Sequence, residues 1–154
     1  MFHKHHKAFT MIELVFVIVV IGILAAIAVP KFAATRGDAE IAKAKATVGA
    51  VRSSIATERQ KRILRGDFAN PITTLHSADN AISIFNADAD GNTGRVLEYS
   101  VPTCATLGKT QGCWKVVGTN YRFMLPTSGY ADFNITNSRF DCDSSDANCK
   151  LLTQ

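Results

Sequence analysis

The chain divides into three stretches by the spacing of its hydrophobic residues. The first is continuous, because residues 14–29 read LVFVIVVIGILAAIAV without a charge or a strongly polar side chain. Counted from Phe9 to Val29, this stretch has 21 residues. As a helix it would measure roughly 30 Å, about the hydrocarbon thickness of a bilayer. The sequence therefore predicts an N-terminal helix that can cross a membrane.

The second stretch, residues 30–65 (the stem), changes to a helical spacing of three and four. Its apolar side chains form one stripe, which consists of Ile41, Ala44, Val48, Val51 and Ile55. Arg65 and Gly66 have the composition of a basic last turn followed by a C-cap glycine. We therefore expect one helix from about Phe9 to Arg65, with its stripe packed on the protein's own head.

The third stretch, residues 66–154 (the head), contains short apolar runs separated by turn residues. Ser77-Ala78-Asp79 could start a short helix through Phe85. With 89 residues, the head is small for an independent core, so the stem should supply one wall. The expected fold is α+β, a long N-terminal helix packed against a small antiparallel β-meander. The predicted strands are Arg95–Val101, Trp114–Val117, Tyr121–Leu125, Tyr130–Ile135 and Arg139–Cys142.

Charge is distributed unevenly among these stretches. The net charge is +4, yet the stem has nine Lys and Arg against three Asp and Glu, whereas the head has six against nine. A basic helix face is usually a solvated surface. Its alternatives are contact with acidic neighbouring molecules, anionic lipid or nucleic acid. This division argues against a cytosolic enzyme spread over the whole length.

Glu13 is the unusual residue of the apolar stretch, because a charge deep in lipid costs about 2.5–3.5 kcal/mol. The nearest basic residue, Lys7, lies six positions back, which is poor geometry for a helical pair. A secretory signal peptide with an A-x-A site at Ala26–Ala28 fits the flanking residues, as does a plain membrane anchor. Neither has a use for the carboxylate.

The residues KAFTMIEL that begin at Lys7 resemble the processing site of type IV pilins and type II secretion pseudopilins. The resemblance implies that residues 1–8 are a leader peptide, which a prepilin peptidase removes between Ala8 and Phe9. It also implies methylation of the new amine of Phe9. Ala8 stands where the family usually has glycine, and both residues are small.

The resemblance gives Glu13 a role in assembly. The carboxylate of one subunit would meet the Phe9 amine of its neighbour, since a paired charge is tolerated in an apolar surrounding. Gly22 and Pro30 would let the helix unwind between them in a filament. The implied domains are residues 1–8 (leader), 9–29 (transmembrane and assembly helix), 30–65 (amphipathic stem) and 66–154 (periplasmic or extracellular pilin-like head).

All four cysteines lie in the head, which fits an oxidising compartment. Three pairings are possible, and we favour Cys104–Cys113 with Cys142–Cys149, because these close short loops. Each disulfide would stabilise the fold by about 2–4 kcal/mol. Zinc fits poorly, because neither spacing is C-x-x-C and the head has one histidine, His76. A C-terminal loop closed by a disulfide again resembles pilins.

A candidate calcium site lies around Asp88, Asp90 and Asn92, which offer oxygen ligands at alternate positions. Thr93 and Tyr99 stand where an EF-hand has glycine and glutamate, so a solvated turn is the main alternative. A second acidic cluster, with a weaker match, consists of Asp141, Asp143 and Asp146.

The sequence contains no catalytic motif such as G-x-S-x-G or a phosphate loop. We therefore expect no enzyme and no cofactor, with calcium as the one exception considered. The first expectation is a type II secretion pseudopilin that polymerises through its N-terminal helix. Alternatives are a surface type IV pilin or DNA-uptake pilin and, from another class, a monomeric membrane-anchored or secreted binding domain.

The resemblance also implies the partners and the cellular place. Partners would be other pilin-like subunits, the prepilin peptidase and an inner-membrane assembly platform, while nucleic acid stays open. The chain would cross the bacterial inner membrane once, with its head in the periplasm, and would enter a filament on assembly.

Overall fold

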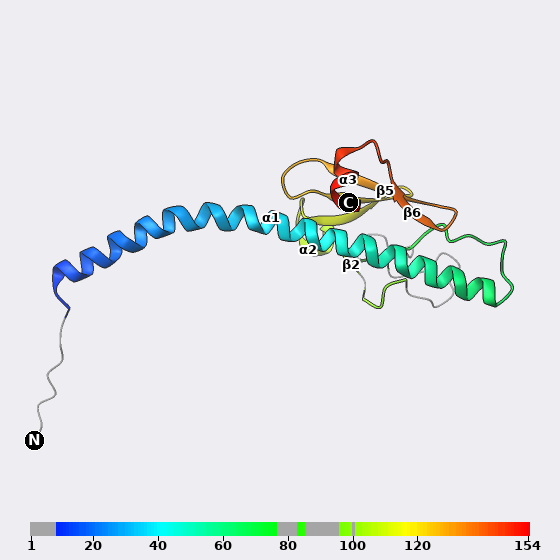
Figure 1. Ribbon diagram of the computed structural model, residues 1–154, viewed down its shortest axis with the longest axis horizontal. Helices are drawn as coiled ribbons and strands as arrows, with labels where there is room; N and C mark the ends of the chain where they lie inside the picture. The colour runs from blue at the N-terminus through cyan, green and yellow to red at the C-terminus, as the bar shows by residue number, and fades with distance from the viewer. Residues whose placement is uncertain (1–8, 77–82, 86–95, 100) are drawn as a thin grey trace, which may run out of the picture. The chain divides into compact units, whose positions relative to one another are not determined.

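The structure is a computed structural model, shown in Figure 1. It describes residues 9–76, 83–85, 96–99 and 101–154. The chain forms two compact units, Met1–Arg36 and Gly37–Gln154, and each is described by itself. The boundary lies inside the stem, six residues beyond Pro30.

Helix α1 (Met11–Leu64) is continuous through both apolar and basic stretches, which confirms one long helix. Its end is the predicted C-cap. Gly66 has a φ of 84° and donates its N–H to the Ile63 carbonyl at 2.9 Å. The Asp67 N–H donates to the Arg62 carbonyl at 2.9 Å. Gly66 is suited to this left-handed position because it has no Cβ.

The predicted meander is confirmed as a four-stranded antiparallel sheet in the order β3-β4-β5-β6. The tight turn between the last two strands has positive φ at both Asn137 (52°) and Ser138 (60°). This is the type I′ geometry that matches the twist of a hairpin. The strands are β3 (Cys113–Val117), β4 (Asn120–Met124), β5 (Tyr130–Thr136) and β6 (Arg139–Cys142).

A second sheet pairs β1 (Ser83–Ile84) with β2 (Val101–Pro102). A short helix was expected to end at Phe85, and this is wrong at its C-terminal end, where Ser83–Ile84 forms strand β1. Residues 77–82, where that helix would begin, lie outside the described residues. Ile84 and Phe85 are both fully buried. Their packing against the sheet outweighs the local capping signal.

The strand expected over Arg95–Val101 is wrong over Val96–Tyr99, which forms bends. Val96 is 6% exposed and Tyr99 is 80% exposed. Val101 pairs with Ile84 of β1, whereas in the bent segment Leu97 donates its N–H to the Phe85 carbonyl at 3.4 Å.

Two short helices were not expected from the sequence. They are α2 (Cys104–Leu107), capped by the side chain of Thr103, and α3 (Ala147–Thr153), capped by Asp146. In each case the cap oxygen accepts a backbone N–H of the first turn, a strong start signal.

Figure 1 shows β5, β6 and α3 beside the part of α1 that belongs to the second unit.

The core lies between this part of α1 and one face of the meander, so the helix does supply one wall. The predicted stripe is confirmed, since Ala44, Val48, Val51 and Ile55 are at most 2% exposed and Ile41 is half-buried. The sheet contributes alternate side chains, as a period of two requires. These are Trp114, Tyr121, Phe123, Phe133 and Phe140.

Phe85 occupies the centre of this aromatic layer. Its ring centroid lies 5.2 Å from Tyr121 and 5.6 Å from both Trp114 and Phe140. Its φ of 63° is unfavourable for a bulky side chain. Complete burial of the ring among three aromatic neighbours offsets that strain.

Candidate functional site

Glu13 has a local partner that the sequence interpretation missed. One carboxylate oxygen accepts the backbone N–H and the hydroxyl of Thr10, both at 2.8 Å. In return, the Glu13 N–H donates to the Thr10 hydroxyl oxygen at 3.3 Å. This reciprocal pattern is a capping box, with signature T-x-x-E at the start of a helix. Thr10 is uncharged, so it fixes the carboxylate without neutralising it.

The first part of α1 exposes its large apolar side chains within the first unit. Phe9 is 86% exposed, whereas Ala8 lies outside the described residues. This part is long and apolar enough to cross a membrane. The exposed side chains include Ile12, Leu14, Phe16, Ile18, Ile21, Leu24 and Ile27. Such a surface needs lipid or other apolar helices around it.

Gly22 and Pro30 both lie inside α1, which is unbroken at either position. Pro30 has no N–H, so the helix lacks one hydrogen bond in that turn. A Cβ at Gly22 would meet nothing within 4 Å, so the glycine is not required for packing in the single chain. Their expected role in helix unwinding stays a prediction.

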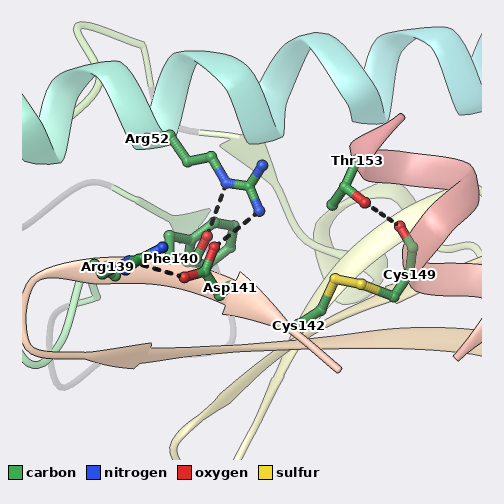
Figure 2. Close-up of polar contacts among 7 residues, drawn as sticks. All are labelled: Arg52, Arg139, Phe140, Asp141, Cys142, Cys149 and Thr153. Atoms are coloured by element: carbon green, nitrogen blue, oxygen red, sulfur yellow. Dashed lines mark hydrogen bonds and ion pairs between the residues drawn. A yellow bond between two sulfur atoms is a disulfide. The ribbon is translucent and has the colours of Figure 1, made fainter. Parts of the chain in front are cut away.

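Arg52 joins α1 to the last strand of the sheet (Figure 2). Its Nε donates to the Phe140 carbonyl at 2.9 Å, and its Nη2 lies 3.0 Å from Asp141 Oδ1. The other Asp141 oxygen is 3.2 Å from Arg139 Nε. Because β6 is an edge strand, Arg52 occupies a carbonyl that another strand could otherwise pair with. Both ion pairs are partly or largely exposed to solvent and contribute at most about 1 kcal/mol each.

Three arginines of the stem make contacts within the chain. Arg59 Nη1 donates to the Asn137 carbonyl and Arg62 Nη1 to the Asn70 carbonyl, both at 3.2 Å. These bonds, with that of Arg52, attach the helix to the hairpin turn and to the chain that follows α1. The solvated surface expected for the basic face is therefore wrong for these three arginines, whereas Lys43 and Lys45 are exposed.

The calcium candidates Asp88, Asp90 and Asn92 lie outside the described residues. Within the described ranges, no group of three or more His, Cys, Asp and Glu side chains could hold a metal. In the second acidic cluster, Asp143 accepts the Ser145 N–H and hydroxyl, which lower the pKa of its carboxyl. Asp146 caps α3. These carboxylates thus have structural partners.

The structure contains two disulfides, Cys104–Cys113 and Cys142–Cys149. This is the pairing favoured from the short loops. The first attaches α2 to β3, and the second attaches α3 to the end of β6 (Figure 2).

His76, the isolated histidine of the head, contacts the core through Tyr121. Its Nδ1 lies 2.7 Å from the Tyr121 hydroxyl, which also accepts the Leu75 N–H at 2.6 Å. The Tyr121 hydroxyl can donate to Nδ1 only when His76 is neutral, because both ring nitrogens of the charged form are donors. Burial lowers the pKa of His76, and burial raises the pKa of Tyr121 to about 12.

Burial of the His76 ring predicts a pH-dependent stability. The folded pKa of His76 is lower than the ordinary 6.5, so its stabilisation is complete above about pH 6.5 and decreases as pH falls through the folded pKa. We expect a loss of about 1 kcal/mol, one hydrogen bond. Urea unfolding followed by the fluorescence of Trp114 between about pH 7.5 and 5 measures it. His76→Gln should remove the dependence, and an unchanged slope in that variant would contradict the assignment.

Comparison with known proteins supplies independent information. A family model described as the prokaryotic N-terminal methylation motif matches residues 3–29. The chain is 47% identical over 95 residues to the type IV narrow pilus major component PilA5 of Thermus thermophilus, covering 54% of this chain and 82% of that protein. A comparison with solved structures found no match.

For two further relatives, the match covers a smaller share of the relative's own length. The type IV major fimbrial protein FimA of Dichelobacter nodosus is 28% identical over 105 residues, which is 65% of this chain and 66% of FimA. The type IV major pilin protein PilA of Myxococcus xanthus is 35% identical over 71 residues, 46% of this chain and 32% of PilA. Three findings agree: the methylation motif, the long apolar helix joined to an antiparallel meander, and the 47% identity over most of a pilus component. They show that the chain belongs to the type IV pilin family.

Proposed function

We propose that the protein is a structural subunit of a surface type IV pilus. The observation that carries this proposal is the 47% identity to a protein named as the major component of a type IV narrow pilus, 82% of which is covered. Before assembly, residues 9–29 anchor the subunit in the inner membrane with residues 66–154 in the periplasm. Residues 30–65 connect the two.

Processing of the N-terminus follows from the same proposal. A prepilin peptidase removes residues 1–8 by cutting between Ala8 and Phe9, and the new Phe9 amine is methylated. The family match over residues 3–29 supports this step. Alanine in place of glycine before the cut is the one departure, and its small side chain suits a narrow peptidase pocket.

Assembly then depends on complementary charge. The first part of α1 moves from lipid into a bundle of identical helices on an inner-membrane assembly platform. There Glu13 of one subunit pairs with the Phe9 ammonium of its neighbour, which makes a buried charge tolerable and fixes the register. The capping box holds the carboxylate at the first turn of the helix without neutralising its charge, which leaves it able to pair with such an amine.

A type II secretion pseudopilin, the first expectation from the sequence, becomes the second candidate. Its N-terminal processing and helix packing would be the same, so residues 9–29 do not separate the two. The relatives named above are pilus or fimbrial proteins, and this favours the surface pilus.

The test is N-terminal mass spectrometry of the protein purified from membranes and from filaments sheared off the cell surface. We expect methylated Phe9 as the first residue in both fractions. An intact Met1 would indicate a plain anchor, and a start at Val29 a secreted protein; either result would overturn the proposal. A methylated subunit confined to the membrane fraction would indicate the pseudopilin.

A further inference from the structure

A polar cavity of about 460 Å³ lies at the C-terminal end of α1, entirely within the second unit. Its walls come from three places: the last two turns of α1, the chain immediately after the helix, and the turn between β5 and β6. The lining residues that bear on its chemistry are Arg59, Arg62, Asp67, Phe68, Asn70 and Asn137. This volume is in the range of sites that bind small organic ligands.

Two guanidinium groups, those of Arg59 and Arg62, line the cavity. Arg59 and Arg62 are three residues apart, so they project from the same side of the helix. Arg62 is only 5% exposed and donates to the Asn70 carbonyl, while Arg59 donates to the Asn137 carbonyl. The Arg59 side chain is thus held by the hairpin turn before a ligand arrives, which lowers the entropy lost on binding.

The carboxylate of the described lining already has hydrogen-bond partners. Among the described residues that line the cavity, Asp67 is the one with a carboxylate. Its Oδ1 accepts the Asn70 N–H at 3.3 Å and the Asn70 side-chain amide at 3.0 Å. Among the described residues no carboxylate forms an ion pair with Arg59, so its positive charge can attract an anion into the cavity.

Arg59 has donors to offer such an anion. A guanidinium carries five N–H groups in a planar fork, and within the described part of the chain only Nη1 of Arg59 donates, to the Asn137 carbonyl. The remaining edge can bind two oxygens of a carboxylate or phosphate side by side. Phe68, 78% exposed at the rim, offers an apolar surface for the carbon skeleton of the ligand.

We infer that this cavity binds an oxyanion carried on a body of monosaccharide size, such as an acidic sugar or a sugar phosphate. The oxyanion lies against the Arg59 fork, and the sugar ring lies against Phe68. The site is formed by one chain, so it exists in the single subunit and does not depend on filament assembly.

The test is calorimetric titration of the full chain in a nonionic detergent without sugar headgroups, at low salt. The probes are glucuronate, glucose 6-phosphate and glucose. We expect both anions, or one of them, to bind at least about tenfold more tightly than glucose, as charge-assisted hydrogen bonds require. A preference between the anions identifies carboxylate or phosphate; equal binding of glucose, or no heat with any probe, overturns the inference.

Variants localise the binding. Arg59→Gln should weaken the anion at least about tenfold, and Arg59→Lys, which keeps the charge but not the fork, should weaken it less. The matched control is Arg65→Gln, which removes the same charge from the exposed helix end outside the cavity and should change affinity less than about twofold. Near-ultraviolet circular dichroism of Trp114 verifies folding. If Arg59→Gln and Arg65→Gln lost the same anion affinity, the effect would come from net charge alone, and the proposed site would be wrong.

Discussion

Replacing Glu13 with alanine is expected to abolish filaments while leaving the subunit in the membrane. Without the carboxylate, the Phe9 ammonium proposed to pair with it is left alone in an apolar helix bundle. Removing one partner of a buried pair costs about 3–5 kcal/mol, more than a hundredfold for each contact. Insertion should persist, because the variant replaces a charge with an apolar side chain. Electron microscopy of sheared filaments and immunoblotting of membranes measure the two effects.

The capping box makes a control necessary. Glu13 also accepts two hydrogen bonds from Thr10, so Glu13→Ala removes a helix cap together with the charge. Thr10→Ala removes the capping hydroxyl and keeps the carboxylate, at a cost of about 1 kcal/mol to the helix. We therefore expect Thr10→Ala to retain filaments. If it lost them as completely as Glu13→Ala, capping would be the function of Glu13; wild-type filament yield in Glu13→Ala would refute both roles.

The sequence was most informative where a residue's neighbours along the helix or strand determine its position. The stripe from Ala44 to Ile55 predicts its own burial because a helix repeats every 3.6 residues. Gly66 predicts the end of α1 because it tolerates a left-handed backbone. In the same way, alternation and turn residues define the strands between Trp114 and Cys142.

Prediction fails where contacts distant in sequence determine the conformation. Ser83–Ile84 forms a strand only because Val101–Pro102 lies beside it. Phe85 accepts a positive φ because three aromatic rings surround it. No local signal reports either neighbour.

The candidate site shows the same division. Glu13 was identified from the sequence because a charge inside an apolar helix is conspicuous. Thr10 could have been found, since T-x-x-E is a known start signal. The cavity beside Arg59 could not, because Asn70 and Asn137 belong to loops that only the fold brings to the helix end. From the sequence alone, the basic residues of the stem have the pattern of a solvated helix face, because the sequence does not show which loops lie beside them.

Phe140→Ala is expected to cause the largest loss of stability in the head. The ring is 1% exposed and stacks on Phe133 with 4.9 Å between centroids and 10° between planes. Deleting such a ring leaves a cavity and costs about 3–5 kcal/mol, a large part of the stability of an ordinary domain. Urea unfolding of the full chain in detergent, followed by the near-ultraviolet circular dichroism of Trp114, measures it.

Two further variants separate cavity formation from aromatic pairing. Phe68→Ala deletes the same side chain at a position that is 78% exposed, and we expect a change within about 0.5 kcal/mol. Phe140→Leu refills most of the volume but loses the stacked ring, so its cost should lie between the two, with about 0.5–1.5 kcal/mol from the lost aromatic pair. If Phe140→Ala cost no more than Phe68→Ala, the ring would not be part of the core. The wall that the sheet presents to α1 would then have to be assigned to other side chains.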